Sequence, residues 1–404
     1  MNHQIISRKP GFAQGLFLIL PIVLGVVGVS VFTATVNLMQ QHFSYVPNGA
    51  YWVNLLQTMP GFWIVAFSPI AGWLADRLGR RNILMLSMVV YALVGMAPFW
   101  LENIWTILLT RCFVGMCESV VLTVTTTMLC DYFHGRTRER WLASQTGVAS
   151  LSALLIIPLG GALGARYGWQ GPFLVYFISL VLVVFVAIYT WEPEHVAPTT
   201  DEIAMVNADA IYQSIPWARM SGIILITLVG SIFFYSTITQ NANALVQLGV
   251  KDPARIGAYA TWASLGVPVG TVLFWFLGRL HINLLLCIDF LIIGIGFTLM
   301  STASTPAGYV MAADLQQVGC GLVLPTLLVW ATRGLAYHVR GRGNGLWQGA
   351  FGLGLFASGI VLQYMGSLYG GSILAAFGVL GRFGLAAAGI ALVAWIVLRR
   401  SRRA

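Results

Sequence analysis

Residues 72–81 read GWLADRLGRR and follow a largely apolar run near residues 50–73. One acidic residue, Asp76, stands here among three arginines, and Gly72 and Gly79 flank them. Glycine tolerates the tight backbone turns that other residues resist, and a carboxylate accepts hydrogen bonds from nearby guanidinium groups. The pattern predicts a polar turn between two membrane-spanning helices.

The composition excludes a water-soluble chain. Of the 404 residues, 58% are hydrophobic and 9% are charged, whereas soluble domains carry about 25% charged residues. A bilayer core of roughly 30 Å requires about 20 apolar residues per helix, and such runs recur along the whole chain. We therefore predict an all-α, polytopic membrane protein with twelve transmembrane helices.

The predicted spans form two groups of six. They fall near residues 14–37, 50–73, 82–100, 104–130, 141–165, 172–190, 220–246, 255–278, 281–300, 306–333, 343–366 and 376–398. The longest polar stretch separates the groups, which gives an N-terminal half (1–190), a cytoplasmic linker (191–219) and a C-terminal half (220–404). An offset of 204 residues superimposes Gly115 on Gly319, as duplicated halves would.

The placement of the basic residues predicts the topology. The net charge is +9, and nearly all arginines and lysines fall on the side of the linker and of both termini. The exceptions are Arg111, Arg166, Lys251, Arg255 and Arg382. The positive-inside rule predicts that both termini are cytoplasmic. The membrane we expect is a bacterial inner (plasma) membrane. The positive charge thus indicates a lipid partner and no nucleic acid.

No enzymatic or cofactor site is predicted. The five cysteines lie in apolar runs without metal-ligand spacing, and the six histidines are scattered. The chain also lacks the HExxH, GxSxG and GxxxxGK[ST] motifs of metalloproteases, hydrolases and ATP-driven pumps. We expect no cofactor and no metal.

The stretch at 72–81 resembles the signature loop of the major facilitator superfamily, G-x-L-a-D-R-x-G-R-[RK]. The pair Arg111-x-x-x-Gly115 in the fourth span and the segment GWQGPF at 168–173 are similar to further patterns of that family. The resemblance covers the N-terminal half by motif and the C-terminal half by layout. It implies two six-helix halves that enclose a central cavity, and a secondary transporter rather than an enzyme.

The resemblance also implies a conformational latch, in which the loop contacts the start of the eleventh span and holds the outward-open state. The latch residues would be Gly72, Asp76, Arg77, Gly79, Arg80 and Arg81. The alternative is that the arginines only fix topology, although topology alone does not require Asp76.

Two charged residues fall inside the predicted fourth span. Arg111 lies roughly 10 Å deep at 1.5 Å per residue, where an arginine costs on the order of 3 kcal/mol. Arg111, Gly115 and Glu118 share one helix face. Gly115 should therefore leave a gap that a water or a residue of a neighbouring helix bridges.

Charged groups within spans are functional by default, so we expect this face to border the cavity. The spacing Arg111-x-x-x-Gly115-x-x-Glu118 resembles organic-anion symporters and spinster-like lipid carriers, which implies roles in substrate binding and proton coupling. The first span lacks the aspartate that those carriers often use. A buried pair that only fixes helix packing is the alternative.

Other polar residues fall on spans that the resemblance places along the pathway. Asp314 is a third candidate for coupling or substrate binding, with capping near the outer surface as its alternative, and Asp289 has no evident partner. The predicted cavity-lining residues are Asn37, Gln57, Tyr235, Gln240, Asn241, Asn243, Trp262, Gln317, Trp347 and Gln348. Amides mixed with large rings suit an amphiphilic molecule.

The predicted function is proton-coupled secondary transport of a small organic or amphiphilic compound by alternating access, with export favoured. Uptake of an organic anion by proton symport is the alternative, because only a shortened form of the antiporter motif occurs, at Ile157 to Gly161. A transport-inactive receptor or scaffold is a further alternative of another class. The expected partners are a small-molecule substrate, protons and the bilayer, and we expect a monomer.

Overall fold

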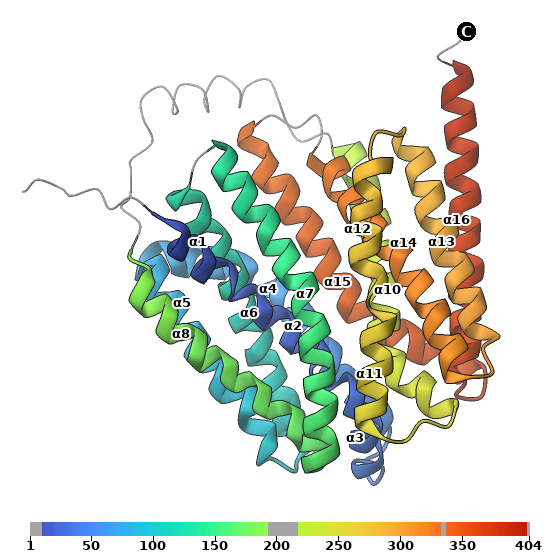
Figure 1. Ribbon diagram of the computed structural model, residues 1–404, viewed down its shortest axis with the longest axis horizontal. Helices are drawn as coiled ribbons and strands as arrows, with labels where there is room; N and C mark the ends of the chain where they lie inside the picture. Colours follow the sequence, from blue (N-terminus) through green and yellow to red (C-terminus); the bar gives the residue numbers. More distant parts are fainter. Residues whose placement is uncertain (1–9, 134, 193–216, 333–336, 402–404) are drawn as a thin grey trace, which may run out of the picture.

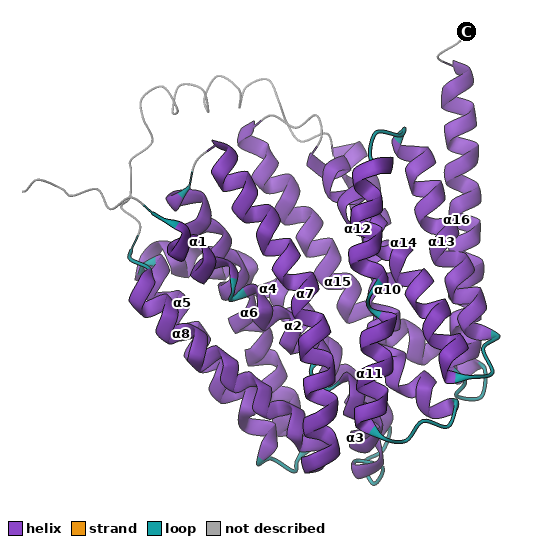
Figure 2. Cartoon of the chain, viewed as in Figure 1, coloured by secondary structure: helices purple, strands orange, loops and turns teal. Residues whose placement is uncertain are grey.

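The computed structural model describes residues 10–133, 135–192, 217–332 and 337–401, and helices make up most of them (Figure 2). In chain order these are α1 (Phe12–Ile19), α2 (Ile22–Ser30), η1 (Thr33–Thr35), α3 (Val36–His42), α4 (Gly49–Leu78), α5 (Arg80–Met96), η2 (Ala97–Phe99), α6 (Ile104–Tyr132), α7 (Gly135–Tyr167), η3 (Gly168–Phe177), α8 (Ile178–Tyr189), α10 (Trp217–Gln247), α11 (Pro253–Ala263), α12 (Gly266–Leu277), α13 (Ile282–Ser301), α14 (Pro306–Thr332), α15 (Tyr337–Leu368) and α16 (Ile373–Ser401).

The prediction of an all-helical membrane protein is confirmed. In the described part of the chain, 11 helical runs are long and apolar enough to cross a bilayer. The longest, Arg140–Tyr189, has 50 residues, more than twice the length that one crossing needs. Gly168 interrupts it with a φ of 71°, and η3 then packs back against α7. The prediction of twelve membrane-spanning helices counts this run as two crossings, and it stays a prediction.

The first predicted span is broken, which the hydropathy pattern did not indicate. Between α2 and α3 the chain forms the short η1. The Thr33 hydroxyl donates to the Val29 carbonyl at 3.5 Å, a side-chain bond that competes with the helical ladder. Gln57 of α4 stabilises the break, because its Nε2 donates to Val29 O at 3.0 Å and to Thr33 Oγ1 at 2.9 Å.

The eighth predicted span is broken between α11 and α12. Pro268 lacks an N–H, and its ring clashes with the carbonyl of the residue four positions earlier, Ser264. After the break, α12 lies very close to α14. A Cβ at Gly266 would lie 2.1 Å from the Asp314 carbonyl oxygen, and one at Gly270 would lie 2.0 Å from the Val318 carbonyl oxygen.

The helices form two sets that lie side by side (Figure 1). We call α1 to α8 the N-terminal set and α10 to α16 the C-terminal set. Because α4 runs from Asn48 to Gly79, we name the two ends of the bundle the Asn48 end and the Gly79 end. Packing of α4 on α15 and of α7 on α11 joins the sets.

Contacts between α4 and α15 concentrate toward the Asn48 end. There, Asn54 Nδ2 donates to Gln363 Oε1 at 3.2 Å across the two sets. Nearer the middle, the rings of Phe62 and Phe356 lie 5.4 Å apart. Toward the Gly79 end, a Cβ at Gly72 would meet no atom within 4 Å.

The second pair of helices shows the same gradient. At the Asn48 end, a Cβ at Gly161 of α7 would lie 2.8 Å from the Pro253 carbonyl oxygen and 3.2 Å from the Gly257 Cα of α11. The continuation of α11 toward the Gly79 end is α12, which packs far less against α7. In the described residues, the two sets therefore meet mainly at the Asn48 end.

Candidate functional site

Arg111 on α6 is completely buried, and neighbouring elements hold its guanidinium group. Nη1 donates to the Tyr176 hydroxyl of η3 at 2.6 Å, and Nη2 donates to the Gly95 carbonyl of α5 at 3.3 Å. The guanidinium carbon lies 5.2 Å from the Phe173 ring centroid and 5.0 Å from that of Tyr176. Hydrogen bonds and ring faces therefore stabilise this cation.

Glu118, two turns along α6, is also completely buried. Its Oε1 lies 3.4 Å from the Tyr91 hydroxyl oxygen of α5, and Oε2 has no hydrogen-bond partner. The same hydroxyl lies 2.6 Å from the Leu24 carbonyl oxygen of α2. The Tyr91 hydroxyl has only one proton to donate, and it donates that proton in the shorter bond, to the Leu24 carbonyl. The Tyr91 oxygen is then an acceptor toward Glu118, which favours a protonated carboxyl.

The carboxyl of Glu118 lies directly against the backbone of α2. A Cβ at Gly28 would lie 1.8 Å from Glu118 Oε1, so only glycine leaves room for this side chain. The carboxyl is also within electrostatic reach of Tyr235 on α10. Glu118 therefore lies near the boundary between the N-terminal and C-terminal sets.

Two tyrosines link Arg111 to Glu118. Tyr176 binds the guanidinium, Tyr91 faces the carboxyl, and the two ring centroids are 5.1 Å apart. This matches the expectation that residues of neighbouring helices would bridge the pair. Sequence reasoning did not single out either tyrosine. The available signal was that Tyr91 is the only tyrosine of the predicted third span.

The expected gap at Gly115 does not exist. A Cβ there would lie 2.6 Å from the Pro60 carbonyl oxygen and 2.8 Å from the Trp63 Cβ. The backbone of α4 fills this space, so Gly115 permits close packing of α4 on α6. Arg111 and Glu118 instead contact α5 and its neighbours η3 and α2.

Asp314 lies in the C-terminal set and is not part of the Arg111 and Glu118 cluster. It is partly buried on α14, where its own carbonyl oxygen lies against Gly266 at the start of α12. Its Oδ1 is buried and has no partner. Asp314 thus adjoins the break in the eighth predicted span.

Half of the predicted cavity-lining residues carry a buried polar atom without a partner. Such atoms are uncommon in folded proteins and call for a water, an ion or a ligand. They are Asn37 Nδ2, Gln57 Oε1, Gln240 Nε2, Gln317 Oε1 and Trp347 Nε1. Both sets contribute to this group.

The other predicted lining residues differ in their surroundings. Asn241 accepts a hydrogen bond from the Tyr309 hydroxyl at 2.8 Å, and Asn243 donates to Gln240 Oε1 at 2.6 Å. The Tyr235 ring packs on Phe351, with centroids 5.1 Å apart. Trp262 and Gln348 are exposed.

At the signature loop, the turn between α4 and α5 is made by Gly79 alone, with a φ of 85°. Gly72 lies inside α4, so the expectation that two glycines bracket the turn is wrong. Arg80 forms an ion pair with Asp131 of α6. Arg81 donates to the Ala187 carbonyl at 2.6 Å.

A carboxylate that the sequence did not indicate caps the start of α5. Glu192 Oε1 accepts from the Arg80 N–H at 2.6 Å, and Oε2 accepts from the Arg81 N–H at 2.9 Å. A negative charge at a helix N-terminus is favourable.

The guanidinium carbon of Arg77 lies 4.4 Å from the centroid of the Trp73 ring. The side chain of Asp76 and the residues just before α15 lie outside the described part, so the latch contact stays a prediction.

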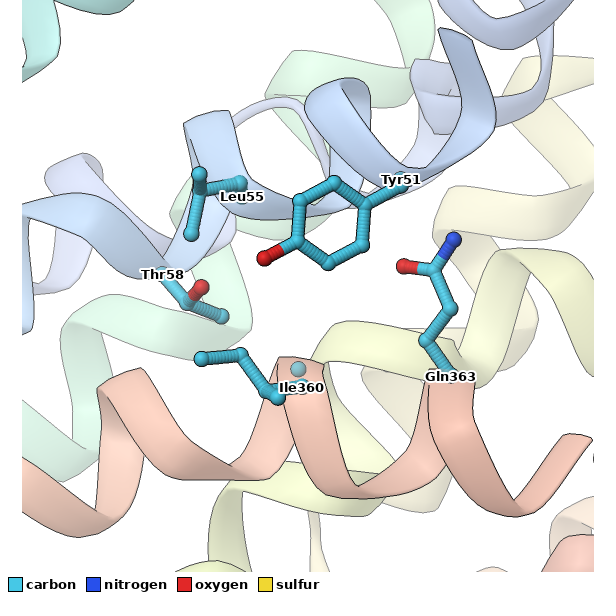
Figure 3. Close-up of a pocket in the computed structure, with 6 residues that line it drawn as sticks. Tyr51, Leu55, Thr58, Ile360 and Gln363 are labelled. Atoms are coloured by element: carbon cyan, nitrogen blue, oxygen red, sulfur yellow. The ribbon is translucent and has the colours of Figure 1, made fainter. Parts of the chain in front are cut away.

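A narrow gap lies between α4 and α15 near the Asn48 end, and it has no enclosed room for even one water molecule. Figure 3 shows Tyr51, Leu55 and Thr58 facing Ile360 and Gln363 across it. Ligand pockets usually measure about 300–1,000 Å³. The gap is therefore too small for a drug-sized substrate and marks the seam between the two sets.

The contact between Gly28 and Glu118 gives a first prediction. Gly28→Ala should destabilise the protein by about 1–3 kcal/mol, because the added methyl group overpacks the carboxyl site. Gly25→Ala, one turn earlier on α2, is the matched control, since a Cβ there would meet only Leu122, at 3.7 Å. Thermal unfolding of purified protein measures the difference. Adding Glu118→Ala to Gly28→Ala should restore stability, and equal melting temperatures for both glycine variants would contradict the steric explanation.

Comparisons with known proteins agree with this architecture. The sequence profile described as Major Facilitator Superfamily matches residues 16–359. The multidrug resistance protein MdtG of Salmonella arizonae and that of Salmonella newport are each 24% identical to this chain over 146 residues. These matches cover 36% of this chain and 35% of each relative. The chain thus spans about a third of the length of these curated relatives.

Solved structures share the fold over nearly the whole chain. The crystal structure of a D-xylose-proton symporter superimposes with a TM-score of 0.78 at 14% identity, over 94% of this chain and 97% of that one. A bacterial homologue of the human lysosomal transporter Spinster, inward-facing and unoccupied, gives 0.68 at 16% identity, over 94% of both chains. Because the superfamily profile also covers most of the sequence, the chain belongs to the major facilitator superfamily of membrane transporters, and it is not an enzyme.

Proposed function

We propose that this protein is a proton-coupled secondary carrier that exports a small organic or amphiphilic compound by alternating access. The observation that carries the proposal is the buried Glu118 carboxyl, which lies between α2, α5 and α6 within reach of Tyr235 on α10. An unpaired carboxylate in such a place is costly. A proton bound to the Glu118 carboxyl favours the present arrangement of the helices. Release of that proton favours an arrangement in which water reaches Glu118.

Arg111 supports the same proposal. Its charge stabilises the ionised form of Glu118 when the proton leaves, and Tyr176 and Tyr91 hold the two groups in a fixed relation. The pair has the properties of a proton site whose affinity changes with conformation. Glu118 Oε2 has no hydrogen-bond partner. A charged pair that only fixed helix packing would not need such an unpaired oxygen.

The distribution of contacts between the sets supports alternating access. Among the described residues, the sets meet mainly at the Asn48 end, and the positive-inside rule predicts that the Gly79 end faces the cytoplasm. The structure then corresponds to an inward-facing state. We propose that residues 1–190 and 220–404 move as two halves of a monomer in the bacterial inner membrane.

The substrate site proposed here lies between the sets, where the buried polar atoms without partners are found. Amide groups of Gln57, Gln240 and Gln317 and the indole N–H of Trp347 offer both donors and acceptors. Mixed donors and acceptors among apolar walls suit an organic compound that is partly polar.

Export is favoured over import because the MdtG relatives are named multidrug resistance proteins. Uptake of an organic anion by proton symport is the second candidate, favoured by the positive charge of Arg111 and by the likeness to a D-xylose-proton symporter. The direction of movement under a fixed pH gradient separates the two. A receptor or scaffold would move nothing.

The signature loop is proposed as the latch of the outward-facing state. In the present structure, Arg80 forms an ion pair with Asp131, Arg81 donates to the Ala187 carbonyl, and Glu192 accepts from the backbone N–H of Arg80. Asp76→Asn should slow transport without reducing the amount of folded protein, and a wild-type rate at equal expression would refute the latch.

The test of the proposed function is transport in proteoliposomes with an imposed pH gradient and a panel of fluorescent amphiphilic cations and anions. Alternating access predicts that joining the two sets at the Asn48 end stops the cycle. In Asn54→Cys/Gln363→Cys, whose native side chains touch, a bifunctional thiol reagent should abolish transport, and a reducible reagent should allow recovery. Each single variant treated alike is the control. Undiminished transport after complete cross-linking would exclude the mechanism.

A further inference from the structure

A second fully buried carboxyl lies in the C-terminal set, outside the site described above. Asp289 on α13 is 0% exposed, and both of its carboxyl oxygens are buried without a hydrogen-bond partner. The helix packs against α14 and α16. Gly319 of α14 brings the backbones close, since a Cβ there would lie 3.0 Å from the Asp289 carbonyl oxygen.

The surroundings of Asp289 hold no compensating charge among the described residues. The titratable groups within its electrostatic reach are the thiols of Cys287 on α13 and Cys320 on α14. On α16, Arg382 is exposed and bonds to the Gly378 carbonyl, and Arg399 lies over the Trp395 ring. An ionised carboxyl here would be a buried charge without a partner, which is strongly unfavourable.

A hydroxyl group lies close to Asp289 on the neighbouring helix. Thr326 of α14 adjoins Asp289, and its hydroxyl donates to the Leu322 carbonyl at 2.8 Å. While its one proton is given to the Leu322 carbonyl, the Thr326 oxygen is an acceptor toward Asp289. A protonated Asp289 carboxyl can donate to that oxygen without disturbing the bond between Thr326 and Leu322.

The same arrangement occurs at Glu118. There the Tyr91 hydroxyl lies nearest the Leu24 carbonyl and turns its oxygen toward the carboxyl. In each set, a buried acid thus lies at the seam of two successive helices, α5 and α6 or α13 and α14, beside a hydroxyl whose proton goes to a backbone carbonyl. Two sites of this kind in one carrier point to one type of chemistry, the binding of a proton.

We propose that Asp289, enclosed by α13 and α14 next to Thr326, is a second proton-binding site, so that the carrier moves two protons in each cycle. The role in transport rests on the proposed function, whereas the protonation of Asp289 does not. Proton binding neutralises the carboxyl and allows α13 and α14 to close around it. Loss of the proton requires that water or a polar group reach the carboxyl when the helices rearrange.

A polar chain connects this region to α10. Gln316 of α14 donates to Cys320 Sγ at 3.1 Å and to the Phe233 carbonyl at 3.1 Å, and it accepts from the Thr237 hydroxyl at 2.8 Å. The helix α10 in turn contacts the N-terminal set. These bonds join the segment of α14 beside Asp289 to α10.

Infrared spectroscopy of the purified full chain in lipid tests the site without any substrate. The wild type should show carbonyl bands of protonated carboxyl groups at neutral pH, and Asp289→Asn should lose one of them. This band should shift in D₂O, because a transported proton must exchange with solvent. Thr326→Val should move the band, since it removes the acceptor and keeps the shape. Asp131→Asn is the matched control and should leave these bands unchanged, because Asp131 is ion-paired with Arg80.

The consequence for transport is a change in stoichiometry. With the membrane potential clamped at zero, a gradient of one pH unit should sustain about 100-fold accumulation of a transported dye from the panel by the wild type and about tenfold by Asp289→Asn. An Asp289→Asn spectrum identical to that of the wild type, or a band that never shifts in D₂O, would overturn the inference. Failure of Glu118→Gln to lose a carboxyl band would overturn the proposed function and leave the Asp289 site standing.

Discussion

Replacing Glu118 by glutamine should leave substrate binding intact and abolish transport driven by a pH gradient. Glutamine has the shape of the protonated carboxyl and fits beside Gly28 and Tyr91, but it cannot release a proton. If Glu118 carries the proton, accumulation of a transported dye in proteoliposomes should fall to the level of empty vesicles. Dye binding, measured by fluorescence polarisation, should remain close to that of the wild type.

Glu102→Gln is the control for this experiment, because Glu102 is an exposed acid just before α6. It should transport like the wild type. An unchanged rate and pH dependence in Glu118→Gln would remove Glu118 from the mechanism. The search would then move to Asp314, whose Oδ1 is also buried without a partner.

The spans could be predicted because lipid imposes a simple rule. Each crossing must satisfy its backbone hydrogen bonds internally and be apolar over about 20 residues, so hydropathy located most helix ends within a few residues. The first and eighth spans contain breaks that hydropathy did not predict. Their breaks depend on local hydrogen bonding at Thr33 and on the ring of Pro268, which averaging over a span does not detect.

The charged pair of the site could also be predicted, whereas its partners could not. Arg111 and Glu118 stand out because charges are rare in apolar spans. Tyr91 and Tyr176 come from other helices, and a tyrosine in an apolar span is equally suited to packing. Only the tertiary structure shows that their hydroxyl groups face this pair.

Long-range contacts explain the remaining differences. Gly115 was expected to open a gap, but α4 fills that space through Pro60 and Trp63. Glu192 follows α8 in the sequence, more than 100 residues after the helix start that it caps. Neither contact can be predicted from the periodicity or the local pattern of the sequence, because both depend on how α4, α5 and α6 pack.

Arg111→Ala should be the most destabilising single change in the N-terminal set. It removes the hydrogen bonds to Tyr176 and Gly95, leaves space beside Phe173, and takes away the cation nearest to Glu118. Truncating a large, fully buried side chain together with its hydrogen bonds costs about 2–5 kcal/mol. The melting temperature of the purified protein and the yield of monodisperse material measure this loss.

Arg111→Lys separates the charge of Arg111 from its geometry. Lysine keeps the cation, but its single ammonium group cannot reproduce the planar fork that reaches Tyr176 and Gly95 together. This variant should therefore recover part of the lost stability and bind dyes more weakly than the wild type. Arg382→Ala removes an exposed arginine and should change stability by no more than about 0.5 kcal/mol. If Arg111→Ala were as stable as Arg382→Ala and still bound and transported dyes, Arg111 would be neither a structural anchor nor part of the coupling site.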